Sequence, residues 1–171
     1  ETPTLTLNRL CGSGLQAVIT AANMISAGDC EFAVAGGAEN MSRSPYLAPA
    51  LRWGARMNDA AMVDMMVGAL SDPFDDVHMG VTAENVARKY GISREDQDAL
   101  ALQSHQRAQL AIDHGYFRAQ VVPIPVKVKR DTLAFEMDET VRGDTSLEKL
   151  AKMKPAFDKT GTVTAGNSSS L

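Results

Sequence analysis

Cys11 is the residue whose surroundings most clearly suggest chemistry. It lies where an alternating segment ending at Leu7 gives way to Gly12 and Gly14 and then to a long apolar-periodic run. We expect it in the first turn of a helix, where unpaired backbone N–H groups and the positive end of the helix dipole favour the nucleophilic thiolate. The alternative is a small apolar side chain, which is how we interpret Cys30, or simply a tight strand-to-helix turn.

The residues beside Cys11 have separate expected roles. Gly12 would let a substrate approach the backbone closely, and Gly14 would let the start of the helix pack tightly against the preceding strand. Ser13 could cap the helix. These features suit a nucleophile at a helix start, and they equally suit a tight turn with no chemistry.

The elements around Cys11 predict a βαβ unit. Residues 4–7 alternate between Thr and Leu and predict a short strand, and apolar residues then recur at helical spacing from Gly14 until Gly28 stops the pattern. The compact apolar run 32–35 is typical of a strand buried on both faces. A strand, a helix and a strand in so short a stretch predict an α/β fold with a parallel-rich sheet.

From residue 41 the chain changes to a loop-rich insertion. Residues 41–77 are rich in Met, Pro, Asp and Arg and predict only a short helix at 60–70. Ser93 is the expected N-cap of the longest later helix, with Asp96 three residues on, and Gly91 and Gly115 are expected helix ends. The later elements predicted are helices at 81–90, 95–114 and 147–153, and an edge strand at 121–128 that contains two prolines.

Composition narrows the class of protein. The chain has 171 residues and a formal net charge of -4, which argues against nucleic acid or an anionic membrane as the main partner. It has no run of about twenty apolar residues, so we expect no membrane span. Its two cysteines fit neither a disulfide framework nor a zinc spacing, so we expect a reducing compartment and no metal. The start at Glu1 rather than Met and the loop-like end at Leu171 lead us to expect an internal piece of a longer protein.

Four motifs together resemble the thiolase family. They stand in the family's order and spacing and cover essentially the whole chain, namely Asn8-Arg9-Leu10-Cys11-Gly12-Ser13-Gly14, Ala35-Gly36-Gly37-Ala38-Glu39-Asn40-Met41-Ser42, His78-Met79-Gly80-Val81-Thr82-Ala83-Glu84-Asn85, and Lys154-Pro155-Ala156-Phe157 with Gly161-Thr162-Val163-Thr164-Ala165-Gly166-Asn167. The resemblance implies a thiolase-like α/β fold and acyl transfer between a cysteine and coenzyme A thioesters.

The resemblance gives Cys11 the role of nucleophile. It would attack a thioester carbonyl and carry the acyl group, and its backbone N–H would be one donor to the oxyanion. The resemblance also assigns the lining of the coenzyme A groove to Leu70, His78, Met79, Arg142, Phe157, Ala165 and Ser169. Considered alone, His78 could be an ordinary surface or core histidine, and Arg142 a solvated surface arginine.

The resemblance also implies a division of the chain. Residues 1–40 would end the first α/β half, 41–164 would be an inserted loop domain that covers coenzyme A, and 165–171 would begin the return to the core. The chain reads Asn167-Ser168-Ser169-Ser170 where the family reads Asn-Ala-Ser-Gly. The family's activating histidine, second cysteine and asparagine motif would come after Leu171, so the chain holds only the nucleophile of these groups.

The expected activity is that of a thiolase, which joins two acetyl-CoA molecules into acetoacetyl-CoA and CoA or cleaves 3-ketoacyl-CoA with CoA. Coenzyme A and its thioesters would be substrates, with no separate cofactor. The expected assembly is a homodimer or tetramer in the cytoplasm, or in a mitochondrion or peroxisome if the source is eukaryotic.

Two alternatives to a thiolase function stay open. One is a decarboxylating condensing enzyme of the same fold, against which His78-Met79-Gly80 and the long insertion argue. The other is a non-catalytic acyl-CoA-binding or interaction module with an inert Cys11.

We interpret the methionine cluster of the insertion as adaptable packing rather than as substrate contacts. Its members are Met62, Met65 and Met66.

Overall fold

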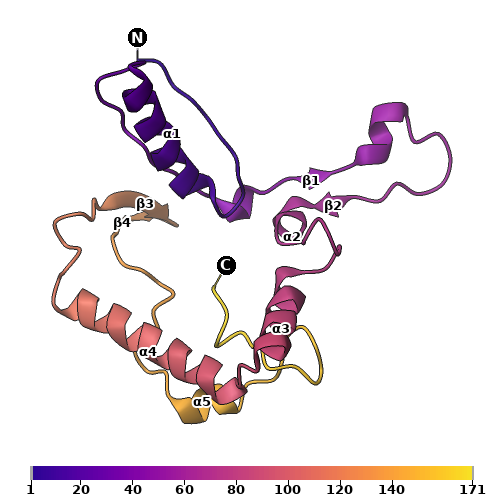
Figure 1. Cartoon of the computed structure of the whole chain (residues 1–171), viewed down its shortest axis with the longest axis vertical. Coiled ribbons are helices and arrows are strands. Elements are labelled where there is room, and N and C mark those ends of the chain that lie inside the picture. The colour runs from indigo at the N-terminus through magenta and orange to yellow at the C-terminus, as the bar shows by residue number, and fades with distance from the viewer. Residues whose placement is uncertain (1, 171) are drawn as a thin grey trace. The chain divides into compact units, whose positions relative to one another are not determined.

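The computed structural model describes residues 2–170, and its internal contacts divide the chain after Ser71 into two compact units (Figure 1). Unit 1 precedes this point and unit 2 follows it. The expected boundaries after residues 40 and 164 concern a whole thiolase and stay predictions. Residues 1 and 171, the ends of the expected division, lie outside the described part of the chain.

Unit 1 contains the predicted long helix. Helix α1 runs over Ser13–Ala27, with Gly12 as its N-cap and Gly28 in the left-handed conformation (φ 82°) as its C-cap. Gly28 permits this ending because it has no Cβ to clash. Residues 10–27 reach a mean hydropathy of 1.2 over 18 residues, so by length and composition alone this stretch could cross a membrane. The core helix of a globular protein passes the same test, so the hydropathy of this stretch is only weak evidence for a membrane span.

The prediction of two strands beside α1 is wrong for this structure. Figure 1 shows an extended segment leading into α1 and another leaving it, but neither residues 4–7 nor 32–35 belong to a strand. Phe32 is 83% exposed and Val34 is fully exposed, whereas burial on both faces was predicted. A parallel strand exists only through hydrogen bonds to neighbours on its sheet. The described residues supply no such neighbour, so the connectivity of a βαβ unit is present without its ladder.

The rest of unit 1 is an excursion closed by a minimal sheet. Its elements are η1 (Met41–Arg43), β1 (Tyr46–Leu47), η2 (Pro49–Trp53), β2 (Val63–Asp64) and α2 (Met65–Ala69). Strands β1 and β2 are antiparallel, with Tyr46 opposite Asp64. The helix predicted over 60–70 is therefore shorter, because Val63 and Asp64 are in the sheet. Asp64 also caps α2, since its side chain accepts a 2.9 Å hydrogen bond from the Met66 N–H.

Unit 2 contains the three other predicted helices. They are α3 (Met79–Tyr90), α4 (Arg94–Asp113) and α5 (Leu147–Ala151). Gly91 ends α3 with a φ of 64°, and the Ser93 side chain accepts from the Asp96 N–H at the start of α4, as predicted. These helices are confirmed because their signals are local caps and spacings.

A β-hairpin replaces the single predicted edge strand. Strands β3 (Ile124–Val128) and β4 (Asp131–Phe135) pair antiparallel, with Ile124 opposite Phe135. The connection is only two residues long, and its first residue, Lys129, has a φ of 57°. Hairpin turns of this kind usually carry Gly, Asn or Asp there, so residues 129–130 contain no turn signal.

Polar side chains share the small core of unit 2 with apolar ones. Ala87, Leu150 and Val163 are buried together with Glu84, Asp98 and Thr164. A buried carboxylate is stable only when hydrogen bonds satisfy its oxygens. The core of unit 2 is therefore also a polar network.

Candidate functional site

Cys11 lies in a tight turn directly before α1. It is two residues ahead of the first helical residue and ahead of the N-cap, so the prediction that it sits in the first helical turn is wrong by one or two positions. The Gly12 N–H donates to the Arg9 carbonyl at 3.0 Å, and the Ser13 N–H donates to the Leu10 carbonyl at 3.0 Å. These bonds turn the chain so that Cys11 is exposed.

Leu10 is in a strained backbone conformation. Its φ of 49° lies in the left-handed region that residues with a Cβ rarely adopt. Such strain persists only where the surroundings hold it, and it gathers at functional sites. The Leu10 N–H donates to the Asn8 side chain at 2.9 Å, and its carbonyl accepts from the Ser13 hydroxyl at 2.7 Å. The residue before Cys11 was not singled out from the sequence, because no residue type there signals the strain.

Ser13 stabilises the turn without being the cap. It is the first residue of α1, and the N-cap Gly12 has no side chain to donate or accept. The Ser13 hydroxyl accepts from the Arg9 N–H at 2.8 Å while donating to the Leu10 carbonyl.

Gly12 and Gly14 both have free space where a Cβ would stand. The nearest atom to a Cβ at Gly12 would be 3.4 Å away, and a Cβ at Gly14 would have no atom within 4 Å. The tight packing expected at Gly14 is therefore not seen among the described residues.

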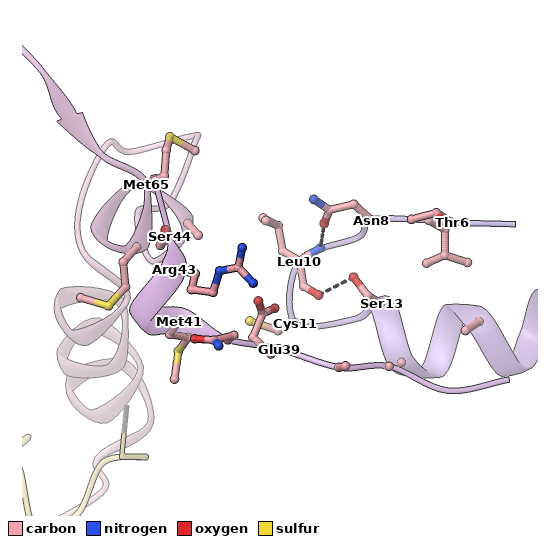
Figure 2. A pocket seen from close by; sticks show the side chains of 18 of the residues that line it. Thr6, Asn8, Leu10, Cys11, Ser13, Glu39, Met41, Arg43, Ser44 and Met65 are labelled. Atoms are coloured by element: carbon pink, nitrogen blue, oxygen red, sulfur yellow. Dashed lines mark hydrogen bonds between the residues drawn. The ribbon is translucent and has the colours of Figure 1, made fainter. Parts of the chain in front are cut away.

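A cleft of about 1010 Å³ opens beside Cys11 within unit 1. Figure 2 shows Cys11 facing the segment that carries Glu39, Met41 and Arg43. Leu70, predicted for the coenzyme A groove, lines the same cleft as Cys11. The lining joins the first two sequence motifs to α2 and consists mainly of Leu5–Asn8, Leu10, Cys11, Ser13, Gly14, Gly36–Met41, Arg43, Pro45, Met65, Met66 and Leu70. Met65 and Met66 thus line the cleft, whereas Met62 does not.

His78 and Phe157 come together in unit 2 at the start of α3, where Met79 is the first helical residue. His78 is the N-cap of α3, and its Nδ1 accepts from the Gly80 N–H at 3.0 Å. Its ring stacks on Phe157 with 4.8 Å between centroids and 21° between planes. A Cβ on Gly80 would overlap the Phe157 ring, so this close approach requires glycine. The structure therefore joins the third and fourth sequence motifs at the start of α3.

The other three predicted groove residues lie on exposed segments of unit 2. The Arg142 N–H donates to His105 Nδ1 at 3.1 Å, which ties its loop to α4 while the residue itself stays exposed. Ala165 and Ser169 are exposed on the loop that follows Thr164. The structure gives these three no contact with one another, so their shared role in binding stays a prediction.

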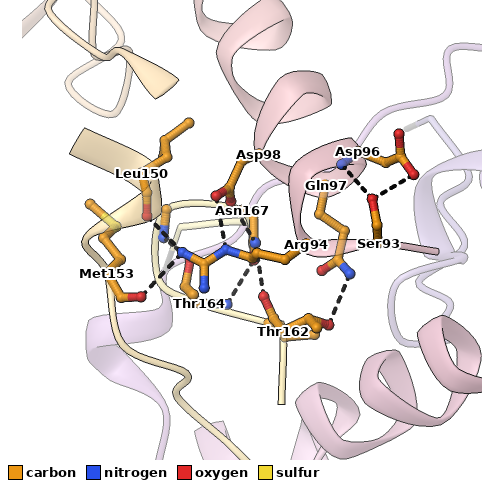
Figure 3. Close-up of polar contacts among 12 residues, drawn as sticks. Ser93, Arg94, Asp96, Gln97, Asp98, Leu150, Met153, Thr162, Thr164 and Asn167 are labelled. Atoms are coloured by element: carbon orange, nitrogen blue, oxygen red, sulfur yellow. Dashed lines mark hydrogen bonds and ion pairs between the residues drawn. The ribbon is translucent and has the colours of Figure 1, made fainter. Parts of the chain in front are cut away.

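Two buried carboxylates were missed by sequence reasoning. Glu84 on α3 is 1% exposed and Asp98 on α4 is 4% exposed. Asp98 accepts from the Asn167 side chain at 3.0 Å and from Arg94 Nε at 2.8 Å (Figure 3). One signal could have revealed Glu84: it falls on the inward stripe of α3, with Gly80 and Ala87 one turn away on either side.

Two carboxylates of unit 2, the exposed Asp144 and the partly exposed Asp158, have lowered pKa values. The pKa of Asp158 is below its ordinary 3.8 because the Thr160 backbone N–H, the Thr160 hydroxyl and Arg88 donate to it. The pKa of Asp144 is lowered by the hydrogen bond and charge of Lys149. Asp158 forms the turn that leads into Thr162, so its ionised form favours the conformation of that segment.

Comparison with known proteins agrees with this arrangement. The family model described as Thiolase, N-terminal domain matches residues 1–171. The chain is 59% identical to the beta-ketothiolase BktB of Cupriavidus necator over 170 residues, which cover 99% of this chain and 43% of that protein. It is 54% identical to an acetyl-CoA acetyltransferase of Chromobacterium violaceum over 172 residues, 99% of this chain and 44% of that protein.

Solved structures agree in fold. An acetyl-CoA acetyltransferase of Bacillus anthracis matches with a TM-score of 0.90 and 48% identity, over 96% of this chain and 42% of that one. A human mitochondrial 3-ketoacyl-CoA thiolase in complex with CoA matches with a TM-score of 0.86 and 43% identity, over 96% of this chain and 41% of that one.

The described fold matches part of the α/β fold that solved acetyl-CoA acetyltransferase and 3-ketoacyl-CoA thiolase structures share. The chain belongs to the thiolase family and matches its N-terminal domain. It spans less than half the length of the curated relatives it matches. The resemblance drawn from the four sequence motifs is confirmed.

Proposed function

We propose that this chain is the nucleophile-bearing part of a thiolase that transfers acyl groups between coenzyme A thioesters. One observation carries the proposal: Cys11 is exposed at a strained turn before α1 and opens onto a large cleft. The high identity to proteins named beta-ketothiolase and acetyl-CoA acetyltransferase supports the same activity. The reaction is condensation of two acetyl-CoA molecules or thiolysis of a 3-ketoacyl-CoA.

The first half-reaction follows from the chemistry of Cys11. Its thiolate adds to the thioester carbonyl carbon, and the carbonyl electron pair moves to oxygen. The Cys11 N–H is our proposed donor to that oxyanion. Collapse of the tetrahedral intermediate breaks the bond to the coenzyme A sulfur, which leaves as a thiolate. The acyl group stays on Cys11, and because one thioester replaces another, the step is close to balanced in energy and reversible.

The second half-reaction consumes the acyl-cysteine. In condensation, a base removes a proton from the methyl group of a second acetyl-CoA, and the carbanion attacks the acyl carbon. The Cys11 thiolate then leaves and acetoacetyl-CoA is released. In thiolysis the Cys11 thiolate adds to the 3-keto carbonyl, the carbon–carbon bond breaks, and the acetyl-CoA carbanion that leaves takes a proton. Coenzyme A then attacks the acyl-cysteine and frees the Cys11 thiolate. By the family resemblance, the base and the activating histidine belong to residues beyond this chain.

Coenzyme A binding is assigned to the predicted groove residues. Leu70 shares the cleft with Cys11, and the His78–Phe157 stack offers a flat apolar surface with a polar edge. The exposed Arg142 guanidinium could stack on the adenine and neutralise phosphate charge. A human thiolase whose structure contains CoA is among the similar proteins. No separate cofactor is needed. We further propose a homo-oligomer located in the cytoplasm, or in a mitochondrion or peroxisome of a eukaryote.

An activity assay with matched cysteine variants tests the proposal. The full-length enzyme that contains this chain is assayed for thiolysis of acetoacetyl-CoA, alone and as Cys11→Ala and Cys30→Ala. Loss of activity in Cys11→Ala with retention in Cys30→Ala is expected. Unchanged activity in Cys11→Ala would contradict the role of Cys11. Release of CO₂ from a malonyl thioester, without thiolysis, would instead support the decarboxylating alternative.

A further inference from the structure

We infer that Glu84 is a positioning residue for coenzyme A binding: its buried carboxylate fixes the segment 161–167 against α3, and thereby fixes Ala165 and Ser169 relative to His78 and Met79. The inference rests on the proposed function, because it concerns the same groove. It adds a residue that does not itself line the groove.

The carboxylate of Glu84 is saturated by donors from one short segment. Its Oε1 accepts from the Thr162 N–H at 2.8 Å and from the Val163 N–H at 2.7 Å. Its Oε2 accepts from the Thr162 N–H at 3.0 Å and from the Thr162 hydroxyl at 3.2 Å. A carboxylate that accepts backbone N–H groups forms charge-assisted hydrogen bonds, which are stronger than neutral ones. Glu84 therefore holds the main chain itself, at two consecutive residues.

Glycine at position 161 makes this approach possible. A Cβ on Gly161 would overlap Glu84 Oε1, so any larger residue would push the segment away from α3. The side chain of Glu84 is 1% exposed, so in this structure the donors of Thr162 and Val163 take the place of water around its charge. The burial of Glu84 therefore depends on the segment 161–167 staying against α3.

Two further contacts hold the residues just before this segment to α3 and its N-cap. Phe157 stacks on His78 at the start of α3, and Asp158 pairs with Arg88 at 3.0 Å one turn beyond Glu84. The three contacts follow the helix in the order His78, Glu84, Arg88. Glu84 is the central and the only buried one of these three, and the exposed Arg88 pair adds little to stability.

The far end of the segment is fixed by α4. Asn167 donates to Asp98 at 3.0 Å and to the Thr162 carbonyl at 3.1 Å, and its Oδ1 accepts from the Thr164 N–H at 2.7 Å (Figure 3). Ala165 lies between these bonds and Ser169 follows two residues after Asn167. Glu84 sets the start of the loop and Asp98 sets its end, so both groove residues are placed by carboxylates outside the groove.

Steady-state kinetics of Glu84→Gln in the full-length enzyme tests the inference. The glutamine keeps the shape but replaces one acceptor oxygen by an NH₂ that faces an N–H donor. The expected result is a rise of about tenfold in KM for coenzyme A during thiolysis, the size expected from one lost charge-assisted hydrogen bond, with kcat within about twofold of wild type. Glu95→Gln, an exposed carboxylate in the first turn of α4, is the matched control and should change neither constant.

Two results for Glu84→Gln would overturn the inference. An unchanged KM would show that the groove does not depend on this carboxylate. A fall in kcat, per folded enzyme, as large as the rise in KM would show a general structural role. Absence of thiolase activity in the wild type would refute the proposed function itself, which distinguishes the two failures. If Glu84→Gln does not fold, hydrogen exchange in the wild type decides: the Thr162 and Val163 amides should be protected before coenzyme A is added. Protection only after its addition would contradict pre-positioning.

Discussion

Substitution of Gly80 by alanine gives a prediction whose sign depends on one contact. Gly80 is the second residue of α3, and a Cβ there would overlap three atoms of the Phe157 ring. Rotation of the ring about its Cβ–Cγ bond cannot relieve the overlap, because one of those atoms is Cγ, which this rotation does not move. Phe157 must therefore swing away and lose its stack on His78.

The magnitude follows from three terms. Overpacking in a fitted contact costs about 1–3 kcal/mol, and the lost aromatic stack costs about 0.5–1.5 kcal/mol more. Alanine regains up to about 1 kcal/mol over glycine in helix propensity, and this gain is smaller close to the N-terminus of a helix. We therefore expect Gly80→Ala to lower the free energy of opening of α3 by about 0.5–4.5 kcal/mol, the range that these three terms span. In a Phe157→Ala background the clash is absent, so the same substitution should raise it by up to about 1 kcal/mol.

Hydrogen exchange of the α3 amides is the appropriate assay, because it reports the local opening free energy of one element rather than of both units. Gly80→Ala, Phe157→Ala and the double variant form a double-mutant cycle. A destabilising effect that changes sign in the Phe157→Ala background is expected. Equal effects of Gly80→Ala in both backgrounds would refute the close approach of the ring to the helix.

Two further predictions concern unit 2. Asp158→Asn should weaken the protection of Gly161 and Thr162 at neutral pH; because the folded pKa of Asp158 lies below 3.8, its contribution is present above that pH and lost as the pH falls through the lower folded value. Exchange rates of wild type and variant should therefore converge in acid, and a difference that persists there would contradict this. Ser93→Ala should destabilise the start of α4 by about 1 kcal/mol, because the Asp96 N–H loses its acceptor. Ser104→Ala, an exposed mid-helix change, is its control by circular dichroism, and equal melting of the two variants would argue against the cap.

The helices could be predicted from the sequence because their signals are local. Gly28 and Gly91 end α1 and α3 in the left-handed conformation, and Ser93 begins α4 with the expected cap. Strands depend on partners, and residues 32–35 have none among the described residues, so an apolar run that predicts a buried strand is exposed instead. Strand β4 was missed because the turn at Lys129 has no glycine.

Part of the candidate site follows from the motifs that carry the family resemblance, and the roles of its residues stay predictions. Cys11 and Leu70 line one cleft, and His78 stacks on Phe157 at the start of α3. Glu84 was not predicted as a site residue, because a glutamate on a helix usually faces water and only its register on α3 places it inside.

The most direct test of the account is the mass of the Cys11 peptide after mixing full-length enzyme with acetyl-CoA. The mass of one acetyl group should appear on the peptide containing Cys11, and none on the peptide containing Cys30. Addition of coenzyme A should remove it, because the step is reversible. An acetyl group that remains after Cys11→Ala, or a Cys11 that stays unmodified while the enzyme turns over, would contradict the role of this cysteine as the acyl carrier.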